Sequence, residues 1–488
     1  MQEARDRVAA LDGLRGLALA AVLAYHVWPS IFPGGFLGVD IFFVLSGYLL
    51  TAVLLREFAA TGINRAAYAA SRVRRIVPGL VGLLGALVVV VPFVAAGDSH
   101  RLPGDIFSSL LGVTNWHLIG DGSSYFAQAG RPSFVRHLWS VAVEIQFYVL
   151  CPFLVGWLAA RRRGLAVVGL VGGIVASAAR MAVLYSSPDP SRAYFGTDAR
   201  LHALLVGCLA AVLLQRTTTG ASAPDNVSTR RFLALAPTAI LVVFVFTASE
   251  TARAMYPAGF LAVEAATALL IALALRPGLV ASVLTRRGLR WLGERSYGIY
   301  LWHWPFVVLV RPGTSADWPA IPAALAVLVG GVTLGELSYR FVERPLLHRN
   351  ARGRNGVAHP WARRAGFVVA VVGAISLAQV PTTSPLEKVI TAGEKVIAAQ
   401  TLPTTTVAPS STTVLPPTTL AVTPTAAPQT ANRRVPVVRA APSAPSPTGN
   451  APPPGTVPVT AVGDSVMVSA AGELHERLGD SGYIDAKQ

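Results

Sequence analysis

The sequence predicts an all-α polytopic membrane protein with about eleven transmembrane helices, followed by a disordered linker and a short α/β fragment. Only 14% of its 488 residues are charged, whereas globular domains carry about 25%. The mean hydropathy is +0.52. Apolar runs close to membrane-spanning length recur as far as residue 380, which indicates a chain that crosses the lipid bilayer many times.

The apolar runs define the expected helices in order. We place them near residues 11–28, 36–55, 76–96, 135–160, 165–185, 198–215, 232–248, 256–275, 296–311, 319–341 and 365–380. The stretch 103–119 is apolar but short and interrupted, so we expect an interfacial or re-entrant piece. If it spans instead, the count rises by one and the tail changes side.

Arginine-rich loops alternate with loops that hold few bases, which predicts the orientation. The rich loops include Arg56 to Arg75, Arg161 to Arg163 and Arg344 to Arg364. The positive-inside rule makes these loops cytoplasmic. Eleven spans then leave the N-terminus in the cytoplasm and the tail outside the cell membrane. The net charge of +16 lies wholly before residue 381, mostly in these loops, so it does not indicate a nucleic-acid partner.

The chain divides into three predicted parts. Residues 1–380 form the membrane region, and 381–459 are rich in proline, threonine, alanine and serine. Such a composition lacks the apolar content for a core and is typical of an extended extracytoplasmic linker. In 460–488, a short apolar strand, a turn and an amphipathic helix are expected.

Two ionisable residues in the first expected helix are the leading candidates for a functional site. Arg15 and His26 are eleven residues apart, which is about three helical turns and about 16 Å, on one face. Ionisable groups inside a membrane helix are costly and usually functional. A fixed cation at one end and an imidazole at the other would suit a long anionic donor. Alternatively, Arg15 is an interfacial anchor and His26 a hydrogen-bonded bundle histidine.

Two acids in other expected spans are candidates to act with His26. Asp40 follows a tight turn, so it could lie beside His26 and orient the imidazole or contact an acceptor hydroxyl. Glu144 lies well inside an apolar helix. The structural alternatives are an interfacial acid for Asp40 and a neutral, hydrogen-bonded acid for Glu144.

Further polar residues recur at the ends of the expected spans. Arg72, Arg74 and Arg75 lie where the third span begins, and guanidinium groups suit phosphate, although they could be ordinary positive-inside anchors. Asp198 could stabilise a helix start or form a local ion pair. The cysteines give neither a disulfide framework nor a metal-ligand spacing, so we expect buried thiols and no metal site. These two cysteines are Cys151 and Cys208. The remaining candidate residues are Arg200, His202, Tyr297, Tyr300, Trp302 and His303.

An ordered set of segments across residues 9–346 resembles the acyltransferase-3 family of integral membrane acyltransferases. The segments are LDGLRGLALAAVLAYH, GGFLGVDIFFVLSGYLL, SRVRRIVP, LWSVAVEIQFY, GTDARLHALLVG, LGERSYGIYLWHWP and SYRFVERPL. The family's arginine–histidine motif falls on Arg15 and His26, its acidic position on Glu144, and its basic cluster on Arg72, Arg74 and Arg75.

The resemblance implies an O-acyltransferase, commonly an O-acetyltransferase. An acyl group would pass from acetyl-CoA, or another acyl-CoA, in the cytoplasm to a hydroxyl of an extracytoplasmic glycan or glycolipid. The arginines would hold the anionic donor, which is a substrate; no bound cofactor is expected. His26 would act as general base, oriented by Glu144 or Asp40, or would carry the acyl group covalently.

The tail segment AVGDSVM resembles the first block of SGNH-type esterases and transferases, in which the GDS serine is the nucleophile. The later blocks, with their aspartate and histidine, are absent. Ser465 therefore has no evident base, and His475 does not match the family's histidine. We expect a truncated SGNH fragment without esterase activity of its own.

Two other classes of function compete with the acyltransferase. Buried ionisable residues also serve membrane transporters and flippases, although the sequence has no clear inverted repeat. An inactive scaffold whose tail recruits cell-wall enzymes is the third hypothesis. Dependence on an acyl-CoA donor would separate the enzyme from the transporter.

Overall fold

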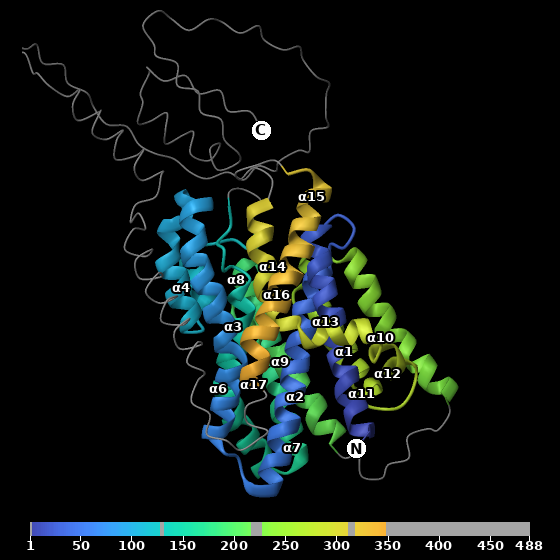
Figure 1. Ribbon diagram of the computed structural model, residues 1–488. Helices are drawn as coiled ribbons and strands as arrows, with labels where there is room; N and C mark the ends of the chain where they lie inside the picture. The colour runs from blue at the N-terminus through green and yellow to red at the C-terminus, as the bar shows by residue number, and fades with distance from the viewer. Residues whose placement is uncertain (1, 127–130, 216–226, 311–317, 348–488) are drawn as a thin grey trace, which may run out of the picture. The chain divides into compact units, whose positions relative to one another are not determined.

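The computed structural model describes residues 2–126, 131–215, 227–310 and 318–347, and these ranges contain helices and turns but no strand (Figure 1). The long helices are α1 (Gln2–Val27), α2 (Gly38–Thr61), α3 (Arg65–Val94), α6 (Leu138–Ala160), α7 (Arg163–Leu184), α9 (Thr197–Leu214), α10 (Val227–Thr247), α11 (Ala258–Ala274) and α14 (Ser296–Val310). The mostly helical architecture agrees with the predicted all-α membrane fold.

Short helices and 3₁₀ turns connect the long helices. They are α4 (Leu102–Leu110), α5 (Thr114–Gly120), α8 (Ser191–Phe195), α12 (Leu279–Leu284), α13 (Arg287–Glu294), η1 (Gly35–Leu37), η2 (Ala96–Arg101) and η3 (Arg253–Met255). The apolar stretch 103–119 is thus two short helices and no span. In Figure 1 the start of α1 lies at the end of the bundle opposite to α4.

Seven helices in the described ranges are long and apolar enough to cross a membrane, and α10 and α11 contribute shorter apolar segments. The seven are α1, α2, α3, α6, α7, α9 and the segment from Ala320 to Leu346. Each predicted helix from 11–28 to 319–341 has a counterpart in the structure, whereas the helix at 365–380 lies outside the described residues. The linker 381–459 and the fragment 460–488 with Ser465 also lie outside them, so the count of eleven spans stays a prediction.

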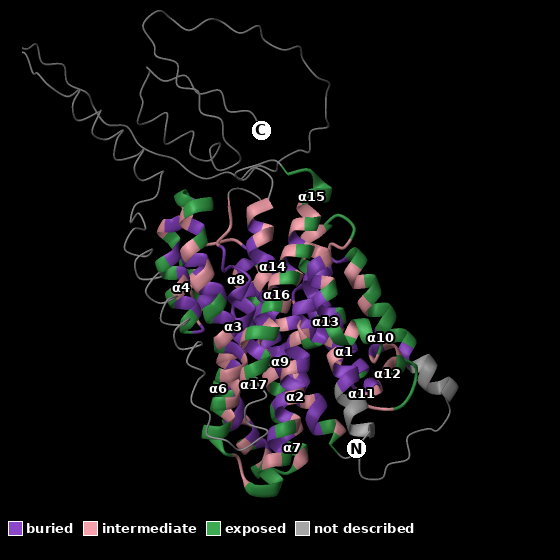
Figure 2. Cartoon of the chain, viewed as in Figure 1, coloured by how far each residue is buried: buried purple, intermediate pink, exposed green. Residues whose placement is uncertain are grey.

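Helices α2 and α9 form the centre of the bundle. In the most apolar 18-residue stretch of each helix, 72% of α2 and 61% of α9 are buried within the described residues, but only 22% of α7. Large apolar side chains of α7 such as Val168 and Val183 are exposed. Figure 2, in which the chain is coloured by burial, likewise shows exposed residues along α10. Lipid is as apolar as these side chains, so such a surface needs no protein cover.

Glycines allow α2 and α9 to cross at backbone contact. A Cβ on Gly47 would lie 2.0 Å from the carbonyl oxygen of Leu204, and one on Gly207 would lie 2.1 Å from that of Val44. Small residues at helix crossings are characteristic of membrane bundles because packing replaces the hydrophobic driving force. Cys208 lies at this crossing, and both it and Cys151 are buried free thiols, as expected.

The last described segment packs against α14 and contains two π-helical turns. It comprises α15 (Ala320–Leu325), η4 (Ala326–Gly330), α16 (Gly331–Ser338), η5 (Tyr339–Glu343) and α17 (Arg344–Leu347), of which η4 and η5 are π-helical. A Cβ on Gly331 would lie 2.8 Å from the Cα of His303. The absence of a side chain therefore brings this segment against the backbone that carries His303.

Candidate functional site

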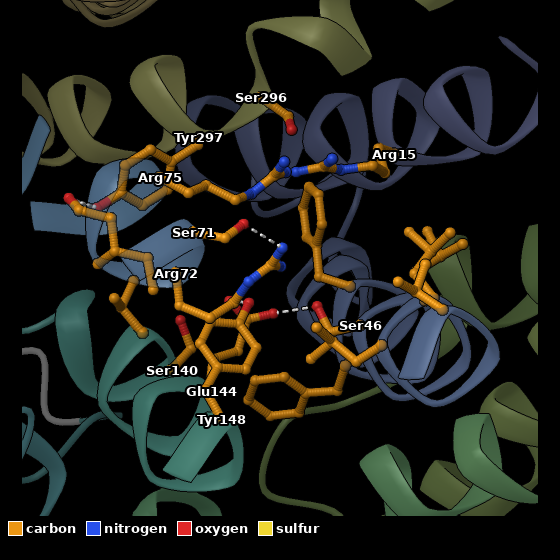
Figure 3. Close-up of a pocket in the computed structure, with 18 of the residues that line it drawn as sticks. Arg15, Ser46, Ser71, Arg72, Arg75, Ser140, Glu144, Tyr148, Ser296 and Tyr297 are labelled. Atoms are coloured by element: carbon orange, nitrogen blue, oxygen red, sulfur yellow. Dashed lines mark hydrogen bonds between the residues drawn. The ribbon is translucent and has the colours of Figure 1, made fainter. Parts of the chain in front are cut away.

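A cavity of about 390 Å³ lies among α1, α2, α3, α6 and α14 (Figure 3). This volume falls within the range of small-molecule sites, which are mostly apolar with a few polar groups. Side chains of α2, including Phe42, Leu49 and Val53, supply an apolar wall. The polar groups that line it are Arg15, Ser46, Glu57, Tyr68, Ser71, Arg72, Arg75, Ser140, Glu144, Tyr148, Ser296, Tyr297 and Tyr300.

Three of the predicted donor-binding arginines line this cavity, and one does not. Arg72 and Arg75 are three residues apart on α3 and share a face, which the structure turns toward Arg15. Arg74 is two residues from Arg72, about 200° around the helix, and is not among the lining residues. The local spacing thus separates Arg74 from the other members of its cluster.

The arginines of the cavity have no acidic partner in the part of the chain that the structure describes. Figure 3 shows the guanidinium groups of Arg15 and Arg75 pointing toward one another. Arg72 donates to Ser71 Oγ at 3.1 Å and lies over the Tyr68 ring. Converging guanidinium groups repel each other unless an anion lies between them, and they match phosphate or carboxylate oxygens.

Glu144 also lies in this cavity, away from His26. Ser46 donates to its carboxylate at 2.5 Å and Tyr148 at 3.2 Å. The interpretation in which Glu144 orients His26 therefore does not fit this geometry. Glu144 is seven residues further along the chain than His137, about 10 Å along the axis of α6, and it is the end near His137 that approaches His26.

Asp40 is likewise separate from His26, because it pairs with Arg200. Arg200 Nη2 donates to Asp40 Oδ1 at 2.6 Å, and neither side chain is exposed to solvent. The Cζ atom of Arg200 lies 4.2 Å from the centre of the Phe260 ring and 5.2 Å from that of Tyr194. The expectation that Asp40 lies beside His26 is wrong: Asp40 is part of a sealed ion pair between α2 and α9.

A second buried pair lies on α9 next to this ion pair. His202 Nδ1 and a Glu264 carboxylate oxygen of α11 are 2.8 Å apart, again with no solvent exposure. Asp198, at the start of α9, accepts from Arg180 and Arg192 at 3.0 Å, which confirms the local ion pair that the sequence allowed. These contacts join α9 to its neighbours, so the polar start of α9 has a packing role.

His26 lies in a separate cluster of rings at the far end of α1. Its imidazole contacts His303 and Trp304 of α14, with ring centres 5.1 and 5.2 Å apart. His137, which precedes α6, is 5.9 Å from both His303 and Trp304 by the same measure. His303 was a candidate from the sequence, whereas His137 was not; the local signal for His137 is its place just before the Trp139 segment.

A proline in α14 gives His137 its hydrogen-bond partner. Pro305 has no N–H, so the carbonyl of Leu301, four residues earlier, loses its helical donor. His137 Nε2 lies 3.1 Å from this oxygen and donates to it. In α6, Pro152 frees the carbonyl of Tyr148 in the same way, and Tyr68 Oη donates to it at 3.0 Å.

Helix α14 connects the cavity with the histidines. Tyr300 lines the cavity, donates to the carbonyl of His137 at 2.8 Å and is hydrogen-bonded to Ser140 at the same distance. His303 follows one turn later on the same helix. The arginine-lined cavity and the histidine cluster are therefore neighbours along one structural element.

The described ranges contain no arrangement of three His, Cys, Asp or Glu side chains suited to a metal ion. The site is instead an arginine-lined cavity with two carboxylates, Glu57 and Glu144, next to a cluster of imidazole and indole rings. Such a set of groups can bind an anion and can accept or transfer protons.

Comparisons with known proteins identify the family of the chain. A family profile described as an acyltransferase domain matches residues 8–339. The chain is 38% identical to YrhL of Bacillus subtilis over 69% of its own length and 54% of that protein. It is 37% identical to the peptidoglycan O-acetyltransferase OatA of Listeria monocytogenes, over 70% of its own length and 56% of the relative's.

The O-acetyltransferase OatA of Staphylococcus aureus is 31% identical over 69% of this chain and 56% of that protein. The match thus covers little more than half the length of these relatives. No solved structure matches the chain. The profile match over most of the membrane region and the identities above 30% show that the chain belongs to the acyltransferase-3 family of membrane proteins.

Proposed function

We propose that this protein is a membrane O-acyltransferase that moves an acyl group, in the first instance acetyl, from a cytoplasmic acyl-CoA to a hydroxyl of a cell-envelope glycan. The observation that carries the proposal is the cavity in which Arg15, Arg72 and Arg75 converge without an acidic partner among the described residues. A polyanionic donor supplies the missing negative charge. Peptidoglycan is the named acceptor of the Listeria relative and is the acceptor we propose here.

The proposed orientation follows from the arginine-rich loops. The start of α1, the end of α2 and the start of α3 carry basic residues, Arg56 and Arg65 among them, so we place this end of the bundle in the cytoplasm. The tail then lies outside the membrane after eleven spans. Arg15 lies near the middle of α1, in the half of the apolar segment Ala9–Val27 that we place toward the cytoplasm, and His26 lies at the other end. Donor binding and acyl delivery would therefore occur at different depths.

In the proposed reaction, the apolar wall of the cavity holds the flexible arm of the donor and the arginines hold its phosphates. His26 either accepts the proton of the acceptor hydroxyl or attacks the thioester carbonyl itself. In both routes the C–S bond breaks and coenzyme A leaves as the thiolate, which takes up a proton. Glu144 lies close to the arginines, and we assign it to the donor cavity.

The test uses the full-length protein in proteoliposomes with acetyl-CoA and peptidoglycan fragments. We expect release of the coenzyme A thiol together with an ester on the glycan, and we expect His26→Ala to abolish both while the protein remains folded. Transfer retained by folded His26→Ala would refute the role of His26. Movement of the glycan across the bilayer without any acyl donor would instead indicate a transporter or flippase.

A further inference from the structure

Three imidazole rings from distant parts of the chain meet at the end of α1. His26 comes from α1, His137 from the residue before α6 and His303 from α14. A neutral imidazole carries its hydrogen on one nitrogen and a lone pair on the other. The hydrogen-bond partner of one nitrogen therefore fixes which nitrogen can accept a proton.

The hydrogen of His303 is fixed by the backbone of α14. His303 Nδ1 lies 2.7 Å from the carbonyl oxygen of Tyr300. A carbonyl oxygen only accepts, so Nδ1 must carry the hydrogen. His303 Nε2 then holds a lone pair, and the side chain is buried with no exposure to solvent.

This lone pair in turn fixes the hydrogen of His26. His303 Nε2 lies 3.3 Å from His26 Nδ1. Because His303 Nε2 can only accept, His26 Nδ1 must donate. His26 Nε2 is left with a lone pair, and in the described structure this buried atom has no hydrogen-bond partner.

We propose that His303 is a positioning residue that holds His26 in one tautomer and makes Nε2 its reactive atom. This inference rests on the proposed acyltransferase function. In the general-base route, Nε2 takes the proton of the acceptor hydroxyl as the oxygen attacks the thioester carbonyl and the C–S bond breaks. In the covalent route, Nε2 forms the bond to the acyl carbon as the C–S bond breaks; the acceptor hydroxyl then attacks the acyl carbon, the C–N bond breaks, and Nε2 takes up the hydroxyl proton. His303 exchanges no proton in either route; it accepts the Nδ1 hydrogen, which becomes a stronger donor when His26 is positively charged.

His137 does not compete for this role. Its Nε2 donates to the carbonyl of Leu301, which Pro305 has left without a helical donor. No hydrogen bond joins His137 to His26 in the described part of the chain. The pairing is therefore specific to His303, although His137 packs against the same indole ring.

The first test compares two substitutions of the full chain in proteoliposomes with acetyl-CoA and peptidoglycan fragments. His303→Leu removes the acceptor, and we expect kcat to fall roughly 100-fold, within the range for general acid–base groups. KM for acetyl-CoA should not change, because His303 does not line the cavity. His303→Gln places an amide oxygen near the position of Nε2 and should restore part of kcat.

His100 provides a matched control. Its Nδ1 also pairs with a carbonyl three residues earlier, that of Gly97, at 2.9 Å, but it lies in η2, away from both the cavity and the histidine cluster. His100→Leu should retain the activity of the unmodified protein. Equal kcat values for His303→Leu and the unmodified protein would overturn the proposal.

The second test observes the tautomer directly and does not depend on turnover. Histidine-selective ¹⁵N NMR of the full chain in lipid, with the His26 signal assigned by its loss in His26→Gln, should show Nδ1 protonated and Nε2 unprotonated. In His303→Gln this pattern should persist, and in His303→Leu it should be lost. An Nε2-protonated His26 in the unmodified protein would overturn the inference. If acetyl-CoA is not consumed at all, the proposed reaction fails, while the NMR result still decides the tautomer.

Discussion

The bundle holds membrane-buried charge in two contrasting regions. In the first, Asp40 and Arg200 form a fully buried ion pair, with aromatic rings beside the guanidinium group. In the second, Arg15 and Arg75 converge on a cavity and have no acidic partner among the described residues. Both regions satisfy the rule that intramembrane charge is costly. Only in the second region is positive charge left for an anionic ligand to neutralise. Whether a buried charge already has a partner in the protein therefore distinguishes a binding site from a structural ion pair.

The largest expected effect is the loss of stability when the buried Asp40–Arg200 ion pair is broken. Asp40→Asn leaves Arg200 charged and uncompensated, and breaking a buried pair costs about 3–5 kcal/mol. We expect a sharply lower thermal midpoint in detergent and little protein in the membrane. Arg75→Gln is the matched change in the cavity and should unfold like the unmodified protein. A midpoint for Asp40→Asn close to that of the unmodified protein would contradict the structural role of the pair.

The corresponding change in the cavity should affect binding. Arg75→Gln removes a charged donor to the anionic ligand, which is worth about 1.5–3 kcal/mol, or roughly a 10- to 150-fold rise in Kd for acetyl-CoA. Equilibrium binding to the purified full-length protein measures this change. Arg74→Gln should weaken binding less, because Arg74 lies on another face of α3, and Arg65→Gln provides a control at the start of the same helix. Equal losses at Arg74 and Arg75 would show that the cavity is not the donor site.

A substitution at the crossing of α2 and α9 tests the close packing of the two helices that carry Asp40 and Arg200. Gly207→Ala puts a methyl group 2.1 Å from the carbonyl oxygen of Val44, so α2 and α9 must separate. Overpacking of this kind costs about 1–3 kcal/mol, which unfolding in detergent would detect. Gly82→Ala in α3 meets no atom within 4 Å and should stabilise the protein by about 0.5–1 kcal/mol. Destabilisation by both substitutions alike would argue against a backbone contact at the crossing.

The smallest expected effect concerns a polar cluster outside the membrane-spanning helices. Asp105, 3.6 Å from His117 Nε2, and Asp121, 3.3 Å away, raise the pKa of the imidazole above its usual 6.5. The folded protein then binds this proton more tightly than the unfolded chain. The stabilisation is complete below about pH 6.5 and is lost as the pH rises through the raised pKa.

His117→Gln removes this dependence on pH. The His117 side chain is partly exposed, so the free energies of unfolding of His117→Gln and the unmodified protein should differ by less than about 1 kcal/mol. Unfolding midpoints measured across this pH range should converge for the two proteins at high pH, with His100→Gln as the control. A stability difference that grows with rising pH would contradict the assignment.

The sequence was sufficient to predict properties that depend on one helix at a time. The apolar runs located the helices, because length and hydropathy are local properties. The spacing of Arg15 and His26 predicted a shared face, and both side chains indeed lie toward α14: Arg15 shares the cavity with Tyr297, and His26 contacts His303. The assignments to catalysis and donor binding themselves stay predictions.

Contacts between helices were beyond sequence reasoning. Asp40 and Arg200 are 160 residues apart, and nothing local shows that α2 and α9 cross where these side chains meet. His137 was missed because its significance depends on a carbonyl in α14. Glu144 was correctly placed inside an apolar helix, and it is partly buried, but its position along α6 relative to the end of α1 depends on how the two helices are packed.

Residues 137 and 305 depend on each other, because His137 donates the hydrogen bond to Leu301 that Pro305 cannot donate. Alanine at 305 would restore the helical donor to Leu301 and would compete with His137 for the same oxygen. Loss of the histidine alone would leave that oxygen without a donor in an apolar interior. We therefore expect these positions to covary: related chains should keep both residues or replace both, even though they are 168 positions apart in the sequence.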